Sequence, residues 1–80
     1  MWLVYAIKSE TRNYIYVGLT NNLERRLHEH NKGYNKTTKP YRPFKLIYSE
    51  IFPSRPEARI KEKYLKGGSG KKFLRQLIKQ

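Results

Sequence analysis

Two short runs of β-branched and aromatic residues open the sequence, and their spacing constrains the fold more than any other feature. Residues 2–8 read WLVYAIK and residues 14–19 read YIYVGL. Runs of this composition favour strands. The polar residues 10–13 between them leave room only for a turn, whereas a parallel pair needs a crossover of a dozen or more residues. The sequence therefore predicts an antiparallel β-hairpin at the N-terminus.

Alternation along these strands predicts which side chains share a face. Successive residues of a strand point to opposite sides of the sheet, so Tyr16 and Gly18 lie on one face of the second strand. A turn centred on Glu10 and Thr11 places Tyr5 directly opposite Tyr16 on that same face. We therefore expect two tyrosines side by side on one face of the sheet.

Cap and breaker signals define the rest of the chain. Asn21, followed three residues later by Glu24, starts a helix that runs to about Asn31 and stops at Gly33. The remaining predicted elements are a loop over 32–42, a strand over 43–52, a helix capped by Ser54 that ends at Gly67 and Gly68, and a third helix capped by Ser69. The predicted class is α+β, a small three-stranded antiparallel sheet flanked by helices in the order ββαβαα.

Length and cysteine content limit the architecture further. Eighty residues make one domain, predicted over 1–80, with a thin core. The chain has no cysteine, which excludes disulfides and thiolate metal sites and fits a reducing compartment. No signal peptide pattern is visible, and no apolar run approaches the length of a membrane span. We expect a cytoplasmic location and no membrane partner.

Positive charge dominates the composition. The formal net charge is +12, and two stretches carry the excess: 32–45 has five basic residues and no acid, and 51–80 has nine basic residues and two acids. Solubility or binding to anionic lipid would also fit, but cations interleaved with aromatic residues favour nucleic acid. The predicted nucleic-acid-binding residues are Lys32, Lys36, Lys39, Arg42, Lys66, Lys71 and Lys72.

The first predicted helix carries polar residues on its inward face. Leu23 and Leu27 define that face, and at about 100° per residue Arg26 and His30 fall on the same side, whereas Arg25 points to solvent. Either Arg26 extends its stem over the core, or its charge is directed at something on the sheet.

The second predicted helix also carries a charged residue beside its apolar face, in this case a carboxylate. Ala58 and Leu65 mark an apolar stripe, which Ile60 and Tyr64 extend, and Glu62 lies at its edge. A charge there needs a partner. A salt bridge to Arg26 or to Lys66, and a functional role, are both consistent with this position.

These polar residues together suit phosphodiester cleavage. A carboxylate can hold Mg²⁺, a guanidinium can stabilise charge developing on phosphate oxygens, and a tyrosine or histidine can move the proton of an attacking water. The predicted catalytic residues are Tyr5, Tyr16, Arg26, His30 and Glu62.

The order and spacing of these residues resemble the GIY-YIG nuclease family over nearly the whole chain. The Gly-Ile-Tyr motif of the family has its counterpart in residues 3–5, LVY, and its Tyr-Ile-Gly motif in residues 16–18, YVG. The segment LERRLHEH supplies the family's helical arginine and the histidine four residues later, and EARIKEK supplies its late glutamate. By this resemblance, Tyr5 and Tyr16 position or deprotonate the water, Arg26 binds the scissile phosphate, and Glu62 holds one Mg²⁺ or Mn²⁺.

The resemblance implies an endonuclease that hydrolyses DNA, either duplex or branched, or RNA. Leu19 stands where some relatives carry a lysine that assists a tyrosine base; if a tyrosine is the base here, its proton must go elsewhere, with His30 or a metal-bound hydroxide as the candidates. The chain has no separate DNA-recognition domain, so we expect low intrinsic sequence specificity, or a partner protein that supplies it. The alternative is a nucleic-acid-binding module with the same fold and little or no cleavage.

Overall fold

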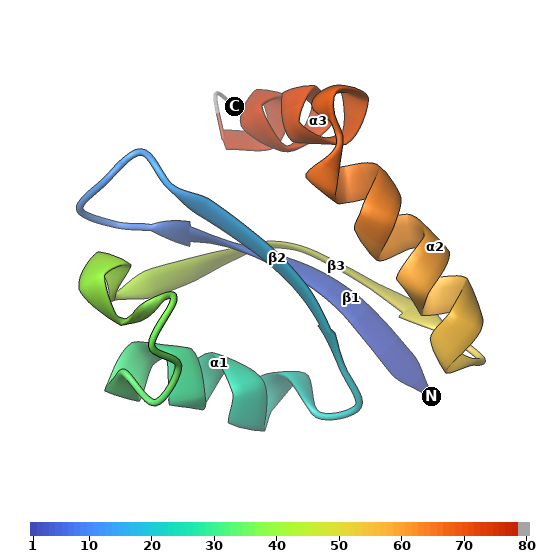
Figure 1. Ribbon diagram of the computed structural model, residues 1–80, viewed down its shortest axis with the longest axis horizontal. Helices are drawn as coiled ribbons and strands as arrows, with labels where there is room; N and C mark the ends of the chain where they lie inside the picture. Colours follow the sequence, from blue (N-terminus) through green and yellow to red (C-terminus); the bar gives the residue numbers. More distant parts are fainter. Residues whose placement is uncertain (79–80) are drawn as a thin grey trace.

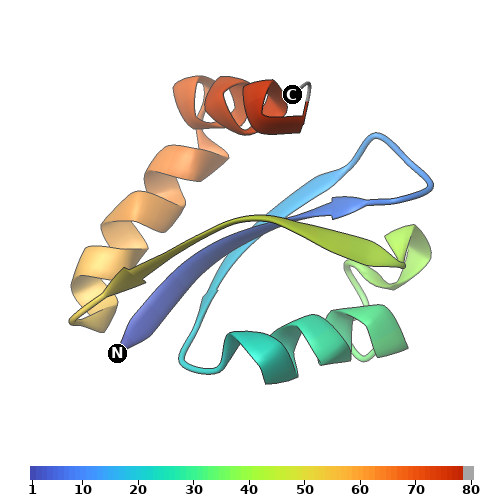
Figure 2. The ribbon, with the colours of Figure 1, turned by 180° about the vertical axis from the view of Figure 1, so that it is seen from behind.

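The computed structural model describes residues 1–78 as a three-stranded antiparallel sheet between two layers of helix. The elements are β1 (Trp2–Ser9), β2 (Ile15–Thr20), α1 (Leu23–Lys32), the 3₁₀ turn η1 (Lys39–Tyr41), β3 (Phe44–Phe52), α2 (Arg55–Lys66) and α3 (Gly68–Ile78). The strand order is β2-β1-β3, with β1 in the centre. In both views α1 covers one face of the sheet, and α2 and α3 cover the other (Figures 1 and 2). The predicted class and element order are confirmed.

The hairpin forms as predicted, but its register differs by two residues. Tyr5 pairs with Gly18, and Ile7 pairs with Tyr16. The turn is longer than expected because the Ser9 hydroxyl accepts hydrogen bonds from the backbone N–H groups of Thr11 and Arg12, which draws both residues into the turn. The two tyrosines still share a face, now as diagonal neighbours with ring centroids 6.3 Å apart.

Alternation along the strands divides the core into two layers. On one face, Val4, Ala6 and Val17 pack with Ala58, Leu65 and Leu74 of α2 and α3. On the other face, Tyr5, Ile7 and Phe44 pack with Tyr16 and with Leu23 and Leu27 of α1. Tyr5, Tyr16, Arg26 and His30 therefore lie in the layer between α1 and the sheet, whereas Glu62 belongs to α2 in the other layer.

Helix ends follow the cap signals, with two corrections. Ser54 caps α2 as predicted. The cap of α1 is Asn22 and not Asn21, because it is the Asn22 side chain that accepts the N–H of Arg25. Ser69 lies inside α3, which already begins at Gly68. Each correction moves a boundary by one or two residues and leaves the faces of the helices unchanged.

The prediction for the apolar stripe of α2 was partly wrong. Ala58 and Leu65 are buried, but Ile60 is 71% exposed and Tyr64 51% exposed. The residue that shares the buried stripe is Glu62, at i+4 from Ala58, with 5% exposure. Ile60 lies about 200° around the helix from Ala58, so the face that buries Ala58 turns Ile60 to solvent.

No helix within residues 1–78 combines the length and the apolar composition needed to cross a bilayer.

Candidate active site

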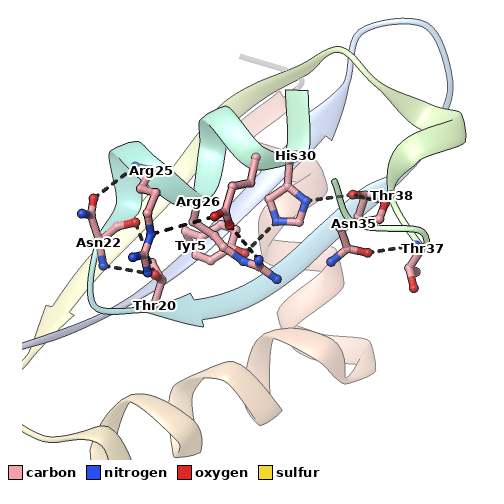
Figure 3. Close-up of polar contacts among 10 residues, drawn as sticks. Tyr5, Thr20, Asn22, Arg25, Arg26, His30, Asn35, Thr37 and Thr38 are labelled. Atoms are coloured by element: carbon pink, nitrogen blue, oxygen red, sulfur yellow. Dashed lines mark hydrogen bonds and ion pairs between the residues drawn. The ribbon is translucent and has the colours of Figure 1, made fainter. Parts of the chain in front are cut away.

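A buried chain of hydrogen bonds runs from the sheet through α1 into the following loop. The Tyr5 hydroxyl lies 2.9 Å from Nε2 of His30, and Nδ1 of His30 lies 2.8 Å from Oγ1 of Thr38 (Figure 3). His30 and Thr38 are fully buried, and Tyr5 is 1% exposed. Three elements distant in sequence are thereby fixed to one another around a single imidazole.

The direction of this chain follows from the Thr38 hydroxyl. That hydroxyl donates to the backbone carbonyl of Asn35 at 3.5 Å. A hydroxyl has one proton, and when that proton is directed at Asn35, Thr38 accepts the hydrogen bond from Nδ1–H of His30. Nε2 of His30 then carries a lone pair and accepts the proton of the Tyr5 hydroxyl. The Tyr5 oxygen can then accept hydrogen bonds through its own lone pairs, one of them from Arg26.

Gly18 allows the Tyr5 phenol to lie across the neighbouring strand. A Cβ at Gly18 would lie 2.7 Å from the Tyr5 hydroxyl oxygen and 3.1 Å from the Tyr16 ring. Any side chain there would displace one of the two tyrosines. The glycine of the Tyr-Val-Gly segment therefore has a steric role, which is to admit the hydroxyl that His30 holds.

Arg26 and Arg25 point in different directions, as the helical periodicity predicts. The Arg26 side chain is 34% exposed, donates to Glu29 through Nη1 at 3.0 Å, and reaches the Tyr5 hydroxyl (Figure 3). The Arg25 side chain is 63% exposed, and its Nε lies 4.0 Å from Glu29. Arg26 thus places a positive charge beside Tyr5 and at the edge of solvent.

Burial sets the protonation states of the central pair. It raises the pKa of Tyr5 to about 12, where the hydrogen bond from Arg26 opposes the rise and the charges of Tyr16 and Glu62 add to it. Burial, and then the charge of Arg26, lowers the pKa of His30 to about 4. At neutral pH the site therefore holds a neutral imidazole and a protonated phenol.

Glu62 lies in the opposite layer, and its contacts are with residues of its own helix. It lies on α2, on the face of the sheet away from α1, yet its charge is one of those that raise the pKa of Tyr5. Its Oε1 accepts from Arg59 at 2.7 Å, and its Oε2 lies 3.2 Å from Nζ of Lys66. The predicted pairing with Lys66 is present. The predicted pairing with Arg26 is absent, because among the described residues Arg26 pairs with Glu29 instead.

The fit of a divalent cation depends on this carboxylate. No group of three or more His, Cys, Asp or Glu side chains suited to a metal occurs within residues 1–78. Mg²⁺ commonly uses one or two carboxylates and completes its coordination with waters and substrate phosphates. The two cations on Glu62 have side chains that are about half exposed, so they can move aside without disturbing the core. Glu62 therefore fits a one-carboxylate site.

The predicted nucleic-acid-binding residues fall into two groups. Lys32, Lys36, Lys39 and Arg42 lie at the end of α1 and in the loop that carries Thr38, and Lys66, Lys71 and Lys72 lie around the junction of α2 and α3; all seven are exposed. The two groups flank the sheet from opposite faces.

Sequence reasoning missed Thr38 and Arg59. Thr38 follows another threonine in a polar loop, and nothing in the pattern distinguishes it, because its role comes from a contact across eight residues. Arg59 stands three residues before Glu62, a spacing that favours a salt bridge on a helix and that a search for partners of Glu62 would have found.

Residues 1–75 match the family described as the GIY-YIG catalytic domain. The chain is 39% identical over 75 residues to the UPF0213 protein SH2523 of Staphylococcus haemolyticus, covering 92% of this chain and 90% of that protein. It is 42% identical over 64 residues to the UPF0213 protein CPE1444 of Clostridium perfringens, covering 79% of this chain and 68% of that protein. It is also 39% identical over 69 residues to the UPF0213 protein YazA of Bacillus subtilis, covering 85% of this chain and 69% of that protein. No solved structure matches the chain. By the extent of these matches, the chain belongs to the GIY-YIG family.

Proposed function

We propose that this protein is a metal-dependent endonuclease that hydrolyses phosphodiester bonds of DNA with low intrinsic sequence specificity. The observation that carries the proposal is the buried link between Tyr5 and His30, with Arg26 at its solvent edge. Buried polar groups are usually hydrogen-bonded, so what supports a function is the combination of this link with the charge of Arg26 beside it and access to solvent. Membership of the GIY-YIG family supports the same class of chemistry.

Each residue of the site has its own role in the proposed reaction. Arg26, partly exposed, binds the scissile phosphate and offsets the charge that develops on its oxygens. The Tyr5 oxygen accepts a proton from the attacking water as its own proton passes to Nε2 of His30. Tyr16, whose ring centroid lies 5.0 Å from that of His30, forms the adjoining wall and positions the water.

Phosphate binding also makes the proton acceptor stronger. The charge of Arg26 is the second cause, after burial, of the low pKa of His30. A phosphate that neutralises Arg26 removes this contribution and raises the pKa of His30. The histidine thus becomes a better base when substrate is in place.

Glu62 is the residue that would hold Mg²⁺ or Mn²⁺. When bound, the ion supplies positive charge to the phosphate that is cleaved. The alternative function, a nucleic-acid-binding module with little or no cleavage, is favoured by one observation: both oxygens of Glu62 already have cationic partners in Arg59 and Lys66.

A plasmid-nicking assay on Glu62→Gln separates the two functions. The parent protein is incubated with supercoiled plasmid and Mg²⁺ or Mn²⁺, with EDTA as the metal-free arm. We expect nicking by the parent, none in EDTA, and none by Glu62→Gln in either metal. In EDTA the same variant should bind DNA as well as the parent or better, since a negative charge facing phosphate has been removed.

Glu57→Gln is the matched control, because Glu57 is an exposed carboxylate on the same helix. It should nick like the parent. Robust metal-dependent nicking by Glu62→Gln would overturn the role of Glu62. Binding by the parent without nicking, across plasmid, branched DNA and RNA, would establish the binding module instead.

A further inference from the structure

A cleft of about 440 Å³ lies beside β2, outside the cluster around His30. Residues 13–17 line one side, and Lys66, Lys71, Leu74 and Arg75 line the other. Its volume falls within the range of small-ligand sites, about 300 to 1,000 Å³. We call it the edge cleft. The cleft thus lies between the outer strand β2 and the helices α2 and α3.

The first wall of the edge cleft is the edge of a strand and not one of its faces. Residues 14 to 17 point alternately to the two faces of the sheet, yet all of them line the cleft. Consecutive residues of a strand can line one cleft together only if the cleft runs along the backbone edge of that strand. β2 is an outer strand of the sheet, and the outer side of such a strand presents N–H and C=O groups that are not used in the sheet.

The second wall supplies three positive charges and no carboxylate. Lys71 and Arg75 are separated by one helical turn on α3, and Lys66 projects from the last turn of α2. An anion that enters meets these cations on one side and backbone N–H groups on the other, the two kinds of donor that bind phosphate in proteins. The chemistry of the cleft therefore fits a phosphodiester backbone.

Two features connect the edge cleft to the candidate active site. Tyr16 lines the cleft and also packs against His30. Lys66 lines the cleft, and its Nζ lies 3.2 Å from Oε2 of Glu62. A phosphate in the cleft competes with Glu62 for this ammonium group, so occupancy of the cleft releases one oxygen of the carboxylate.

We propose that the edge cleft binds the sugar-phosphate backbone of an unpaired nucleic-acid strand next to the bond that is cleaved. A duplex is too wide to enter a space of this size, whereas one strand can lie along β2. The substrate class would then be a nucleic acid with a single-stranded segment, such as a flap, a branch or a frayed end. The link between the cleft and cleavage rests on the proposed function. Binding of the single strand in the cleft does not depend on that function.

An acidic peptide is the competing ligand, since an extended peptide can add to the edge of a sheet. The continuity of the cleft with Tyr16, and through Lys66 with Glu62, favours the nucleic acid. Tyr16 and Glu62 both belong to the site that would act on a phosphodiester.

The test is binding in EDTA, measured by fluorescence anisotropy with a labelled oligothymidylate and with a blunt duplex of the same length. The cleft variant is Lys71→Ala with Arg75→Ala. The control is Arg55→Ala with Lys63→Ala, which removes the same charge from exposed positions outside the cleft. For the single strand, the slope of log affinity against log salt should fall by about 1.4 in the cleft variant, about 0.7 per lost phosphate contact, and should change little in the control.

Amide chemical shifts locate the bound strand. On titration with oligothymidylate, the N–H resonances of Ile15 and Val17 should move. Equal losses in the cleft and control variants, unmoved resonances for Ile15 and Val17, or tighter binding of poly-glutamate than of oligothymidylate would each overturn the proposal. Because the assay needs no metal and no cleavage, a protein that failed to nick plasmid would leave this result interpretable.

Discussion

Thr38 is the residue whose role is hardest to see in the sequence and clearest in the structure. Its hydroxyl donates to Asn35 and accepts from His30, and so assigns the ring proton to Nδ1. The other nitrogen, Nε2, is thereby left to accept from Tyr5. In the proposed mechanism Thr38 is a positioning residue: it touches no substrate, and it sets the direction in which the proton of Tyr5 moves.

Replacing Thr38 tests this tautomer directly. Thr38→Val keeps the shape and removes the acceptor, so Nδ1–H loses its partner and the proton is free to move to Nε2. We expect the ¹⁵N shifts of the His30 ring to change and cleavage to fall by about 100-fold, the low end of what a positioned acid–base group contributes. Thr38→Ser should restore both. Unchanged ¹⁵N shifts in Thr38→Val would contradict the assignment, whatever the activity.

The low pKa of His30 predicts how stability depends on pH. An unfolded histidine binds its proton at about pH 6.5, whereas folded His30 does so at about 4. Between these values the unfolded state holds more protons, so stability is complete above about pH 6.5 and is lost as the pH falls toward 4. The loss amounts to about 3 kcal/mol at most.

Urea unfolding at pH 7 and pH 5, for the parent and for His30→Gln, measures this effect. The glutamine variant cannot titrate at this position, so its stability should fall less than that of the parent between the two pH values. Equal losses in the two proteins would mean that another group is responsible.

At the scale of elements, the junction of α2 and α3 depends on one glycine. A Cβ at Gly70 would lie 2.2 Å from the carbonyl oxygen of Tyr64 and 2.4 Å from Cα of Leu65. Backbone atoms cannot move aside as a flexible side chain can. Gly70 therefore permits α3 to cross closely over the end of α2, which in turn holds Lys71 and Arg75 beside β2.

Gly70→Ala should destabilise the fold by about 1 to 3 kcal/mol, the usual cost of overpacking. Gly68→Ala is the control, because a Cβ there meets nothing within 4 Å and alanine favours helix over glycine by about 1 kcal/mol. Denaturant unfolding measures the stability of both variants. Gly70→Ala should be less stable than the parent, and Gly68→Ala should be as stable or more stable. Equal stabilities would show that the helices can separate without cost.

Elements were more predictable from the sequence than the contacts between them. Ser54 and its downstream glutamate signal a helix start that local chemistry alone decides. The hairpin register depended on hydrogen bonds that the Ser9 hydroxyl accepts from the backbone of the turn, which enlarge it. The exposure of Ile60 depended on which stripe of α2 faces the sheet. The partnership of His30 and Thr38 depended on how a loop returns to its helix, and neither propensity nor periodicity encodes a return of this kind.

At the scale of the molecule, the candidate site is assembled from both layers around the sheet. Periodicity indicated that Arg26 and His30 face inward and that Glu62 is unusually placed. Periodicity did not indicate that Glu62 lies on the opposite side of the sheet from the other four predicted catalytic residues. The placement of Glu62 depended on which face of the sheet α2 covers, and that is a property of the chain's path between elements.

The charge of the whole molecule leads to the last prediction. With a net charge of +12, we expect any variant that loses cations to bind DNA less tightly than the parent, so the position of the proposed contacts must be found by comparing variants of equal charge. Replacing Lys36, Lys39 and Arg42 with alanine removes three exposed cations from the loop beside α1. If all three contact phosphates, the salt slope for duplex DNA should fall by about 2.7, about 0.9 for each contact. Replacing Lys45, Arg55 and Lys63 instead leaves the same net charge and should change the slope much less. Equal slopes in the two triple variants would show that duplex DNA is held by the overall field of the protein and not by this loop.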